Sequence, residues 1–335
     1  MSSRPAVLVL AHGELSESLF PAPVRAKLES FAEARYNDLG RGMKQEELQA
    51  RVGDVTGCIT TWGSPKFTPE VVAAAPKLKI IAHAAGTVKP FVSDPVFERG
   101  IVVTSAAPII ARYVGEMALA FTLTCLRDLP GHDRVIKNGG WHDVNLGLPR
   151  TLLEQRVGLI GFGSTGREFA RLLRPFNVEL LVCDPHVDQT VIAQYGGKPA
   201  AMEEVLTTCR VISLHAASIP ATKHLLNAER LRLIPAGALL VNTARGALID
   251  LDALVKELET GRFAAALDVF DPEEPLPASH PIRELPNVIL TPHVSGPVKE
   301  RYWEMAMGAV EDIEMVCAGK TPPGAISAEQ IARMA

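Results

Sequence analysis

The sequence predicts an α/β protein of two domains, each built on a parallel β-sheet. The chain has 335 residues, which is more than one hydrophobic core usually serves. Short apolar runs typical of strands alternate with helix-spaced apolar residues along most of the chain, as they do in parallel sheets. A glycine-rich turn lies in mid-chain, so a complete α/β unit precedes it.

The N-terminal part of the chain predicts the first sheet. Strands are expected at the apolar or β-branched runs 6–11, 55–61, 78–82 and 101–104. Helices are expected where apolar residues recur at helical spacing, at 18–34, 44–52 and 68–75. Ligands of such sheets bind beyond the carboxyl ends of the strands, so residues 62–66 and 85–87 are candidate substrate contacts.

The rest of the chain predicts the second sheet and a returning helix. A long helical pattern at 108–129 predicts the connection out of the first domain, and a polar, glycine-rich loop is expected at 139–150. Strands are then expected at 157–160, 178–183, 211–214, 238–242, 264–269 and 288–291. Helices are expected at 166–176, 202–207, 228–233, 251–260 and 297–317, and the last of these is expected to rejoin the first domain.

The most informative stretch is 157–184, which reads VGLIGFGSTGREFARLLRPFNVELLVCD. Gly161, Gly163 and Gly166 form the pattern G-x-G-x-x-G between a strand and a helix. Gly161 permits a tight turn, Gly163 lets the backbone approach a pyrophosphate, and Gly166 allows the helix to pack closely on the strand. The N-terminus of that helix directs unpaired N–H groups and the positive end of its dipole at the phosphates.

The strand that follows this helix ends on Asp184, about 20 residues after the glycines, where a carboxylate can accept hydrogen bonds from the adenosine ribose. A 2′-phosphate would be repelled by Asp184, and the next residues, Pro185 and His186, supply no arginine. The sequence therefore predicts a dinucleotide site that prefers NAD to NADP. The alternative is a purely structural glycine turn, which is less favoured because strand, turn, helix, strand and terminal acid occur together.

Composition argues against nucleic-acid and membrane partners. The net charge is −4, and no basic run or basic-aromatic stripe is present. No window approaches 18 uninterrupted apolar residues, and the N-terminal apolar run is too short for a signal peptide. Five scattered cysteines predict reduced core residues of a cytoplasmic protein, and no metal site is expected.

Charged groups follow three predicted strands of the second domain: Arg245, the pair Glu273 and Glu274, and His293. Reduction of a ketone by a hydride needs a proton donor for the developing alkoxide, and histidine titrates in the right range. A neighbouring carboxylate would orient the histidine, and an arginine can grip a substrate carboxylate with two hydrogen bonds. Taken singly, each residue could have a structural role or lie on the solvated surface. Their joint placement at strand ends favours a catalytic role.

Several segments resemble the signature blocks of the D-isomer-specific 2-hydroxyacid dehydrogenases. The resemblance runs in order from about Leu78 to Trp303 and is carried by GFGSTG with LLVCDP, SLHAASIPATKHLLN, ALLVNTARGALIDLDAL, AALDVFDPEEPLP and NVILTPHVSG. It implies a Rossmann-type, doubly wound NAD-binding domain of residues 106–297, inserted into a flavodoxin-like parallel α/β substrate domain of residues 1–105 plus 298–335. It also implies a homodimer that interconverts small 2-oxo acids and D-2-hydroxy acids.

The same resemblance implies roles for individual residues. Arg245 would bind the substrate, His293 would transfer the proton, and a glutamate in the loop after Asp268 would pair with the histidine. Backbone N–H groups of the turn Ala85, Gly86 and Thr87 would hold the substrate carboxylate. Besides the three glycines, the implied cofactor contacts are Ser164, Thr165, Asp184, His215, Thr243, Ala244 and Asp268.

The acidic loop departs from the family pattern, because DPEEPLP contains two glutamates where relatives have one before the proline. Counting from Asp268 selects Glu273, whereas counting back from Pro275 selects Glu274. Glu273 is the prediction, since the strand end sets geometry more rigidly than the loop beyond it.

The substrate turn also departs, because HAAGTVKPF replaces a glycine-valine-glycine run. The family resemblance therefore implies no particular substrate specificity. Thr87 and Lys89, or Trp62 with Lys66, are candidates to contact the substrate's side group, although both lysines also fit a solvated surface.

The leading hypothesis is an NAD-dependent dehydrogenase of D-2-hydroxy acids in which His293 is the general acid and base. One alternative is an NAD(H)-sensing regulatory protein on the same scaffold. Another is a dehydrogenase of a different hydride donor, phosphite or formate. Formate is disfavoured, because it has no oxygen that must gain or lose a proton and formate enzymes of the family place a glutamine where the acid would be.

Overall fold

The computed structural model describes residues 4–142, 149–272, 274–332 and 334. The chain divides into two compact units, one of residues 1–110 with 297–334 and one of residues 111–296. The domain boundaries expected from the sequence, 105/106 and 297/298, stay a prediction. Both units are parallel α/β sheets, which confirms the predicted fold class.

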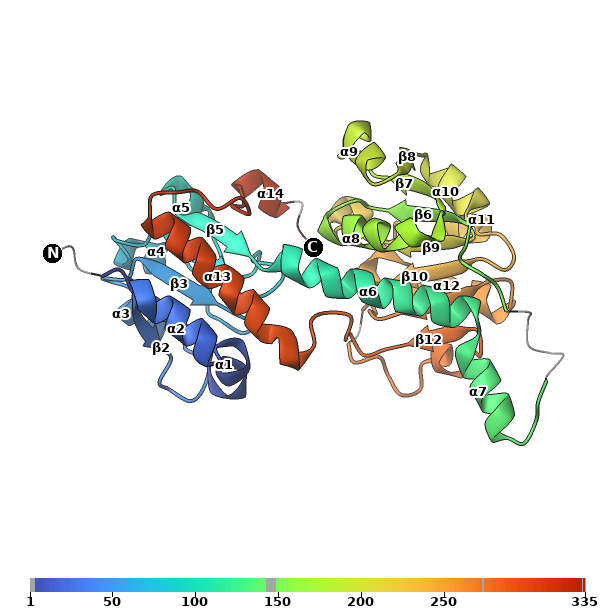
Figure 1. Cartoon of the computed structure of the whole chain (residues 1–335), viewed down its shortest axis with the longest axis horizontal. Helices are drawn as coiled ribbons and strands as arrows, with labels where there is room; N and C mark the ends of the chain where they lie inside the picture. The colour runs from blue at the N-terminus through green and yellow to red at the C-terminus, as the bar shows by residue number, and fades with distance from the viewer. Residues whose placement is uncertain (1–3, 143–148, 273, 333, 335) are drawn as a thin grey trace. The chain divides into compact units, whose positions relative to one another are not determined.

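The first unit contains a five-stranded sheet in the order β2-β1-β3-β4-β5, with every neighbouring pair parallel (Figure 1). Its strands are β1 (Ala6–Val9), β2 (Glu33–Tyr36), β3 (Gly57–Thr60), β4 (Ile80–His83) and β5 (Val102–Ser105). Its helices are α1 (Gly13–Leu19), α2 (Ala22–Phe31), α3 (Gln45–Arg51), α4 (Pro69–Ala74), α5 (Asp94–Glu98), α13 (Tyr302–Cys317) and α14 (Ala328–Ala332).

Alternate residues of each strand enter different cores, because successive side chains point to opposite faces of a sheet. In β1, Val7 and Val9 pack into a cluster with residues of α2 and α13, which we call the α13-side core. Leu8 packs into the opposite cluster with residues of α3, α4 and α5. The returning chain therefore completes this unit: Ile313 and Val310 of α13 are fully buried in the α13-side core.

The second unit contains a seven-stranded parallel sheet in the order β12-β11-β10-β9-β6-β7-β8. Its strands are β6 (Arg156–Ile160), β7 (Glu179–Cys183), β8 (Gly197–Pro199), β9 (Val211–Leu214), β10 (Leu239–Asn242), β11 (Ala264–Leu267) and β12 (Val288–Leu290). The strand order reverses at β6, which is the arrangement of a doubly wound dinucleotide-binding sheet.

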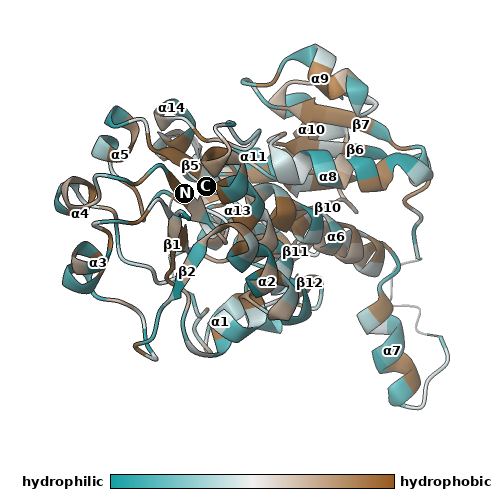
Figure 2. Ribbon diagram, turned by 60° about the vertical axis from the view of Figure 1, so that its left-hand side comes forward, coloured by the Kyte–Doolittle hydropathy of each residue, from teal (hydrophilic) through white to brown (hydrophobic). Residues whose placement is uncertain are grey.

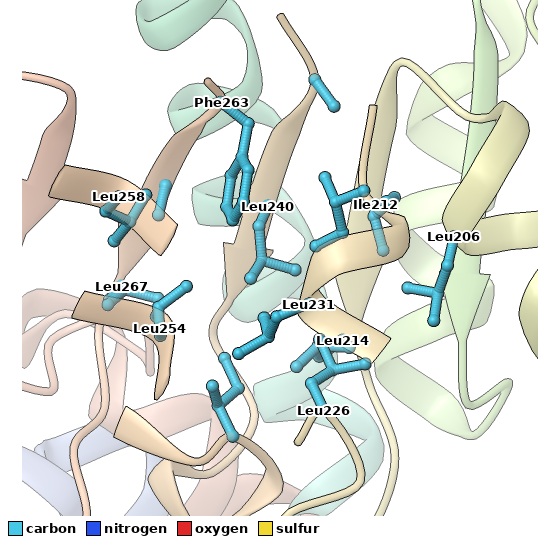
Figure 3. Packing of buried hydrophobic residues seen from close by; sticks show 14 of the residues in the cluster. Leu206, Ile212, Leu214, Leu226, Leu231, Leu240, Leu254, Leu258, Phe263 and Leu267 are labelled. Atoms are coloured by element: carbon cyan, nitrogen blue, oxygen red, sulfur yellow. The ribbon is translucent and has the colours of Figure 1, made fainter. Parts of the chain in front are cut away.

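The second unit has seven helices among its described residues, and all of them except α7 pack on the sheet. They are α6 (Ala107–Leu126), α7 (Leu129–Lys137), α8 (Ser164–Leu173), α9 (Gln189–Gln194), α10 (Met202–Thr208), α11 (Ala228–Leu233) and α12 (Leu251–Glu259). Residues of α10, α11 and α12 form one core with Leu240 of β10 (Figure 3). Residues of α6 and α8 form the other core with Leu239 and Val241. Short 3-10 turns lie at Arg174–Phe176, Pro220–Thr222, Gly246–Leu248, Pro281–Glu284 and Lys299–Arg301.

The structure corrects the single helix predicted at 18–34. Two helices occupy this stretch, and they are separated at Pro21, which has no N–H to continue a helix and is the N-cap residue of α2. The end of the stretch belongs to the edge strand β2, whose sequence EARY is half-exposed and therefore lacks the apolar run of a buried strand.

The helix predicted at 108–129 is likewise two helices. Asp128 lies between α6 and α7 with a left-handed φ of 45°, and its carboxylate caps α7 by accepting the Gly131 N–H at 3.2 Å. Helix α6 is long and apolar enough to cross a membrane, but the core helices of soluble proteins meet the same criteria of length and composition. Phe121 and Leu126 of α6 are buried in the second unit's core.

Helix α7 exposes apolar surface. Leu129 and Ile136 are 55% and 50% exposed, and brown and teal bands alternate along α7 in Figure 2. Trp141, just after it, is 78% exposed. The predicted loop at 139–150 lies partly outside the described residues.

Truncating Leu240 to Ala should destabilise the second unit by about 2–5 kcal/mol, because the side chain is fully buried and its removal leaves a cavity. Urea unfolding followed by circular dichroism would measure this loss. The matched control is Leu233→Ala on α11, which is 39% exposed and should cost no more than about 0.5 kcal/mol. Equal losses in the two variants would contradict the packing described for β10.

Candidate active site

Most of the predicted site residues lie at one edge of the second unit's sheet. The register sets the last residues of neighbouring strands side by side, in the order Cys183, Ile160, Leu214, Asn242, Leu267 and Leu290. The residues that follow these strands therefore form a row: Asp184, Gly161, His215, Thr243, Asp268 and Thr291. Parallel pairing alone brings these polar groups together from distant parts of the sequence.

The glycine turn after β6 has the geometry that its pattern predicts. Gly161 has a φ of +93°, and a Cβ there would lie 2.4 Å from the backbone nitrogen of Ala216, so no side chain fits. A Cβ on Gly166 would lie 2.7 Å from the Gly161 carbonyl oxygen. Gly163 instead faces open space, with no atom within 4 Å of its would-be Cβ, at the start of α8.

The N-terminus of α8 begins directly after this turn, where the pattern predicts a phosphate-binding element. Ser164 and Thr165 are its first residues, and Ser164 is exposed. Unpaired N–H groups at a helix start attract anions. The space beside Gly163 is open, and unpaired N–H groups follow it at the start of α8. This combination fits the pyrophosphate of a dinucleotide.

Asp184 is fixed beside the same turn. One carboxylate oxygen accepts the Phe162 N–H at 2.7 Å, and the other accepts the His186 N–H at 2.9 Å. Each oxygen retains a further lone pair, so the carboxylate can also accept from a hydroxyl. The ribose contact of Asp184 stays a prediction.

Buried polar atoms without partners lie along this edge. Thr243 Oγ1, Ser295 Oγ and His215 Nδ1 are buried and have no hydrogen-bond partner among the described residues. Buried polar atoms are normally paired, so such groups indicate where a ligand supplies the missing bonds. The ribose hydroxyl groups and the carboxamide of NAD would provide suitable hydrogen-bond partners, so these residues fit the cofactor.

His215 is a neutral member of this set. Its Nε2 lies 2.9 Å from Ser213 Oγ, and its ring lies 5.5 Å from that of Phe169. Burial lowers the pKa of His215 to about 3, so the ring carries no charge at neutral pH. This histidine can therefore donate or accept a hydrogen bond to a cofactor but cannot act as a cation.

Arg245 lies in a short turn held by Asn242. The Asn242 side chain accepts the Ala244 N–H at 3.1 Å and donates to the Arg245 carbonyl at 2.9 Å. The guanidinium donates to the Ala244 carbonyl at 2.7 Å. Burial lowers the pKa of Arg245 below its usual value, and the nearby Glu274 carboxylate partly reverses this effect.

The next residue, Gly246, brings two site loops together. A Cβ on Gly246 would lie 2.1 Å from the carbonyl carbon of Phe270, so the chain after Arg245 can approach this loop only with a glycine there. The Phe270 N–H donates to Glu274 at 2.9 Å. Because the two loops lie this close together, the Glu274 carboxylate is near enough to Arg245 to affect the pKa of the guanidinium.

Asp268 organises the turn that carries His293. One of its oxygens accepts hydrogen bonds from the Thr291 hydroxyl and the Val294 N–H, and the other accepts the Ser295 N–H at 2.8 Å. The Asp268 carbonyl accepts the His293 N–H at 2.9 Å. His293 itself has a φ of +56°, a left-handed conformation that is uncommon outside glycine.

The partner of His293 is Glu274. Its carboxylate lies 2.8 Å from His293 Nδ1, and the His293 side chain is 51% exposed. The sequence-based choice was Glu273, which lies outside the described residues; the hydrogen bond described in the structure assigns the pairing to Glu274 instead. Phe270 explains the difference, because its N–H fixes the second oxygen of Glu274 and so sets the carboxylate's position.

The predicted substrate turn belongs to the first unit and follows β4. The Ala84 N–H donates to Thr60 at 2.8 Å, and the Ala85 carbonyl accepts the Ala106 N–H at 3.0 Å. Ala85 is buried, whereas Gly86 and Thr87 are partly exposed. Contact of this turn with a substrate carboxylate stays a prediction.

Two further residues of the site were not predicted from the sequence. Asn242 braces the Arg245 turn, and Ser295 carries an unpartnered buried hydroxyl beside Asp268. Asn242 is a polar residue at the end of β10, whereas Ser295 lies five residues beyond β12, in the turn after His293. Its position at a strand end is the signal that could have identified Asn242; no such signal marks Ser295.

A doubly wound sheet with a glycine turn at its reversal point, and a histidine–carboxylate pair at the same edge, define a nucleotide-dependent oxidoreductase. The chain belongs to the D-isomer specific 2-hydroxyacid dehydrogenase family, whose NAD-binding domain matches residues 119–295. This confirms the family resemblance and NAD as cofactor. Membership supports NAD-dependent oxidoreductase activity on 2-hydroxy acids in general.

Individual relatives extend the match beyond this domain. A glyoxylate reductase of Thermofilum pendens is 33% identical over 295 residues, covering 85% of each chain. A D-3-phosphoglycerate dehydrogenase of Haemophilus influenzae is 29% identical over 310 residues, covering 90% of this chain and 72% of that protein. A phosphoglycerate oxidoreductase structure from Rhizobium etli matches with a TM-score of 0.82 at 27% identity, covering 97% of this chain and 98% of the other.

Replacing Glu274 by Gln should lower kcat by about 10²-fold, because the amide cannot stabilise a charged imidazole. Steady-state kinetics with NADH and a 2-oxo acid would measure this. Glu273→Gln is the matched control and should stay near the wild-type rate. A large loss in Glu273→Gln with none in Glu274→Gln would restore the sequence-based choice.

Replacing Asp184 by Asn should reduce the preference for NADH over NADPH, measured as a ratio of kcat/KM values, by about tenfold or more. The change removes the charge that repels a 2′-phosphate. The control is Asp188→Asn, which alters an exposed acid that caps α9 four residues further on. An unchanged cofactor ratio in Asp184→Asn would exclude the proposed role of the charge.

Proposed function

We propose that this chain interconverts a small 2-oxo acid and its D-2-hydroxy acid with NAD, and that His293 is the general acid and base. The main support is the hydrogen bond of 2.8 Å between His293 and Glu274 at the edge of the NAD-binding sheet. The bound cofactor supplies the hydride in the reducing direction. The residues of this chain then have to bind the 2-oxo acid and transfer one proton.

In this proposal His293 carries the proton. With Nδ1 directed at Glu274, Nε2 is the ring atom left to face the substrate oxygen. In reduction, Nε2 donates a proton to the oxygen of the former carbonyl, and Glu274 stabilises the charged ring before that transfer. In oxidation, the neutral ring takes the hydroxyl proton. The exposed position of His293 gives the ring access to substrate and solvent.

In this proposal Arg245 binds the substrate carboxylate. A guanidinium can donate two parallel hydrogen bonds to a carboxylate, which fixes the orientation of the adjoining carbonyl. The partial burial of Arg245 strengthens the attraction between its guanidinium and the carboxylate, because less water competes for these hydrogen bonds. We propose separately that backbone N–H groups of the turn Ala85, Gly86 and Thr87 bind a carboxylate.

The substrate proposed is a short 2-oxo acid of the size of glyoxylate. Relatives described as glyoxylate reductases are 30–33% identical to this chain over most of its length. We also propose that the protein works in the cytoplasm as a homodimer. The exposed apolar residues Leu129, Ile136 and Trp141 support an association of this kind.

Replacing His293 by Ala should lower kcat by about 10²-fold or more while leaving the Kd for NADH nearly unchanged, because the ring contributes to proton transfer rather than cofactor binding. NADH oxidation with a panel of 2-oxo acids would measure the first quantity, and NADH fluorescence the second. A wild-type rate in the variant would exclude His293 as proton donor. Tight NADH binding by a wild-type chain that turns over no member of the panel would favour an NAD(H)-sensing protein.

A further inference from the structure

His83 is a buried histidine shortly before the proposed substrate turn. It is the last residue of β4, and the turn Ala85, Gly86 and Thr87 begins two residues later. Only 1% of His83 is exposed. Successive side chains of a strand alternate between faces, so His83 lies on the face of Ile81, in the core that α3, α4 and α5 cover. Any effect of this imidazole on a substrate is therefore transmitted through neighbouring residues.

The ring of His83 has two specific contacts. Its Nδ1 lies 2.8 Å from Oγ1 of Thr60, the residue paired with His83 on β3. The ring also packs on that of Phe91, with centroids 4.7 Å apart and planes inclined at 33°. The imidazole thus connects the ends of β3 and β4 to a residue at the far end of the loop that follows β4.

Phe91 closes the loop that contains the turn. Its N–H donates to the Val88 carbonyl at 2.9 Å, and its carbonyl accepts the Phe67 N–H at 2.8 Å. Val88 is fully buried in the core on the same face of the sheet. The loop therefore starts at the backbone of His83 and ends against its ring, so one residue constrains both ends of the loop.

The turn itself presents unpaired donors. The consecutive N–H groups from Ala85 to Val88 have no hydrogen-bond acceptor among the residues that the structure describes. A run of adjacent backbone N–H groups can bind an anion such as a carboxylate, provided that the groups point to one place. The backbone geometry of the turn thus determines how well these donors converge on a ligand.

A histidine at this position costs stability. Its Nε2 is buried without a hydrogen-bond partner among the described residues. Burial lowers the pKa of His83 to about 4, so the ring is neutral at neutral pH and supplies no charge to attract a carboxylate. A leucine would fill apolar surroundings without an unpaired nitrogen. Stability alone therefore does not explain the imidazole, and its contacts with Thr60 and Phe91 indicate a positional role.

We propose that His83 is a positioning residue that holds the backbone N–H groups of the turn Ala85, Gly86 and Thr87 in the orientation that binds the substrate carboxylate. This inference rests on the proposed function and on the role proposed for that turn. The ring fixes the loop through Thr60 on one side and Phe91 on the other. Because the buried ring does not touch the substrate, its loss should weaken substrate binding and leave the chemical step intact.

Replacing His83 by Leu should raise KM for glyoxylate about tenfold or more, because poorly oriented N–H groups lose part of their charge-assisted hydrogen bonds. The kcat should stay within about twofold of the wild type, since no reacting group changes. The Kd for NADH should also stay unchanged, because the predicted cofactor contacts belong to the second unit. His83→Asn places an amide atom near the position of Nδ1 and should give an intermediate KM.

Thr60 supplies a second, matched pair of variants. Thr60→Val removes the hydroxyl at nearly constant shape and should raise KM as His83→Leu does, whereas Thr60→Ser keeps the hydroxyl and should behave like the wild type. The two residues act through one contact, so their effects should not add. The double variant of Thr60→Val with His83→Leu should therefore have the KM of the more affected single variant.

The assay is NADH oxidation at varied glyoxylate, with NADH fluorescence for the Kd and circular dichroism for the Tm of each variant. An unchanged KM in both His83→Leu and Thr60→Val would overturn the proposal, even if the Tm falls, because His83 would then be structural only. A lower kcat at unchanged KM would overturn it as well. If His83→Leu does not fold, the comparison of Thr60→Val with Thr60→Ser decides the question. A wild-type chain that reduces no 2-oxo acid would remove the proposed function and this inference together, whereas an active wild type with unchanged variants would remove only the role of His83.

Discussion

The candidate active site depends on the fully buried carboxylate of Asp268. It accepts the Thr291 hydroxyl and two backbone N–H groups, and so determines the path of the chain through His293. A buried carboxylate is stable only when its oxygens are satisfied in this way. The left-handed backbone of His293 costs free energy, and these bonds offset that cost. Without them the imidazole would have no fixed relation to Glu274.

Each reactive group at this edge is positioned through a less reactive neighbour. Asn242 sets the turn of Arg245, the Phe270 N–H sets Glu274, and Asp268 sets His293. Such supporting bonds hold the functional side chains in orientations that loops alone would not maintain. By contrast, Thr243 Oγ1 and Ser295 Oγ are buried without partners among the described residues, which is where a bound cofactor would contribute.

Much of this arrangement could be predicted from the sequence, because central strands such as β9 and β10 are buried on both faces and read as apolar runs. The edge strands β2 and β8 could not, since half-exposed sequences such as EARY and GKP lack that pattern. The site residues at strand ends followed from parallel topology. The choice between Glu273 and Glu274 depended on loop packing, where Gly246 meets Phe270, and counting along the chain does not contain that information.

The discontinuous first unit has a consequence for biosynthesis. Its α13-side core combines strands from the start of the chain with Val310 and Ile313 near its end. During translation, domains generally fold as units as they emerge. The stretch 111–296 is continuous and complete before α13 leaves the ribosome. The strands of the first unit, although they precede this stretch, must wait for α13, and until then their apolar face is an exposed surface that a chaperone could recognise.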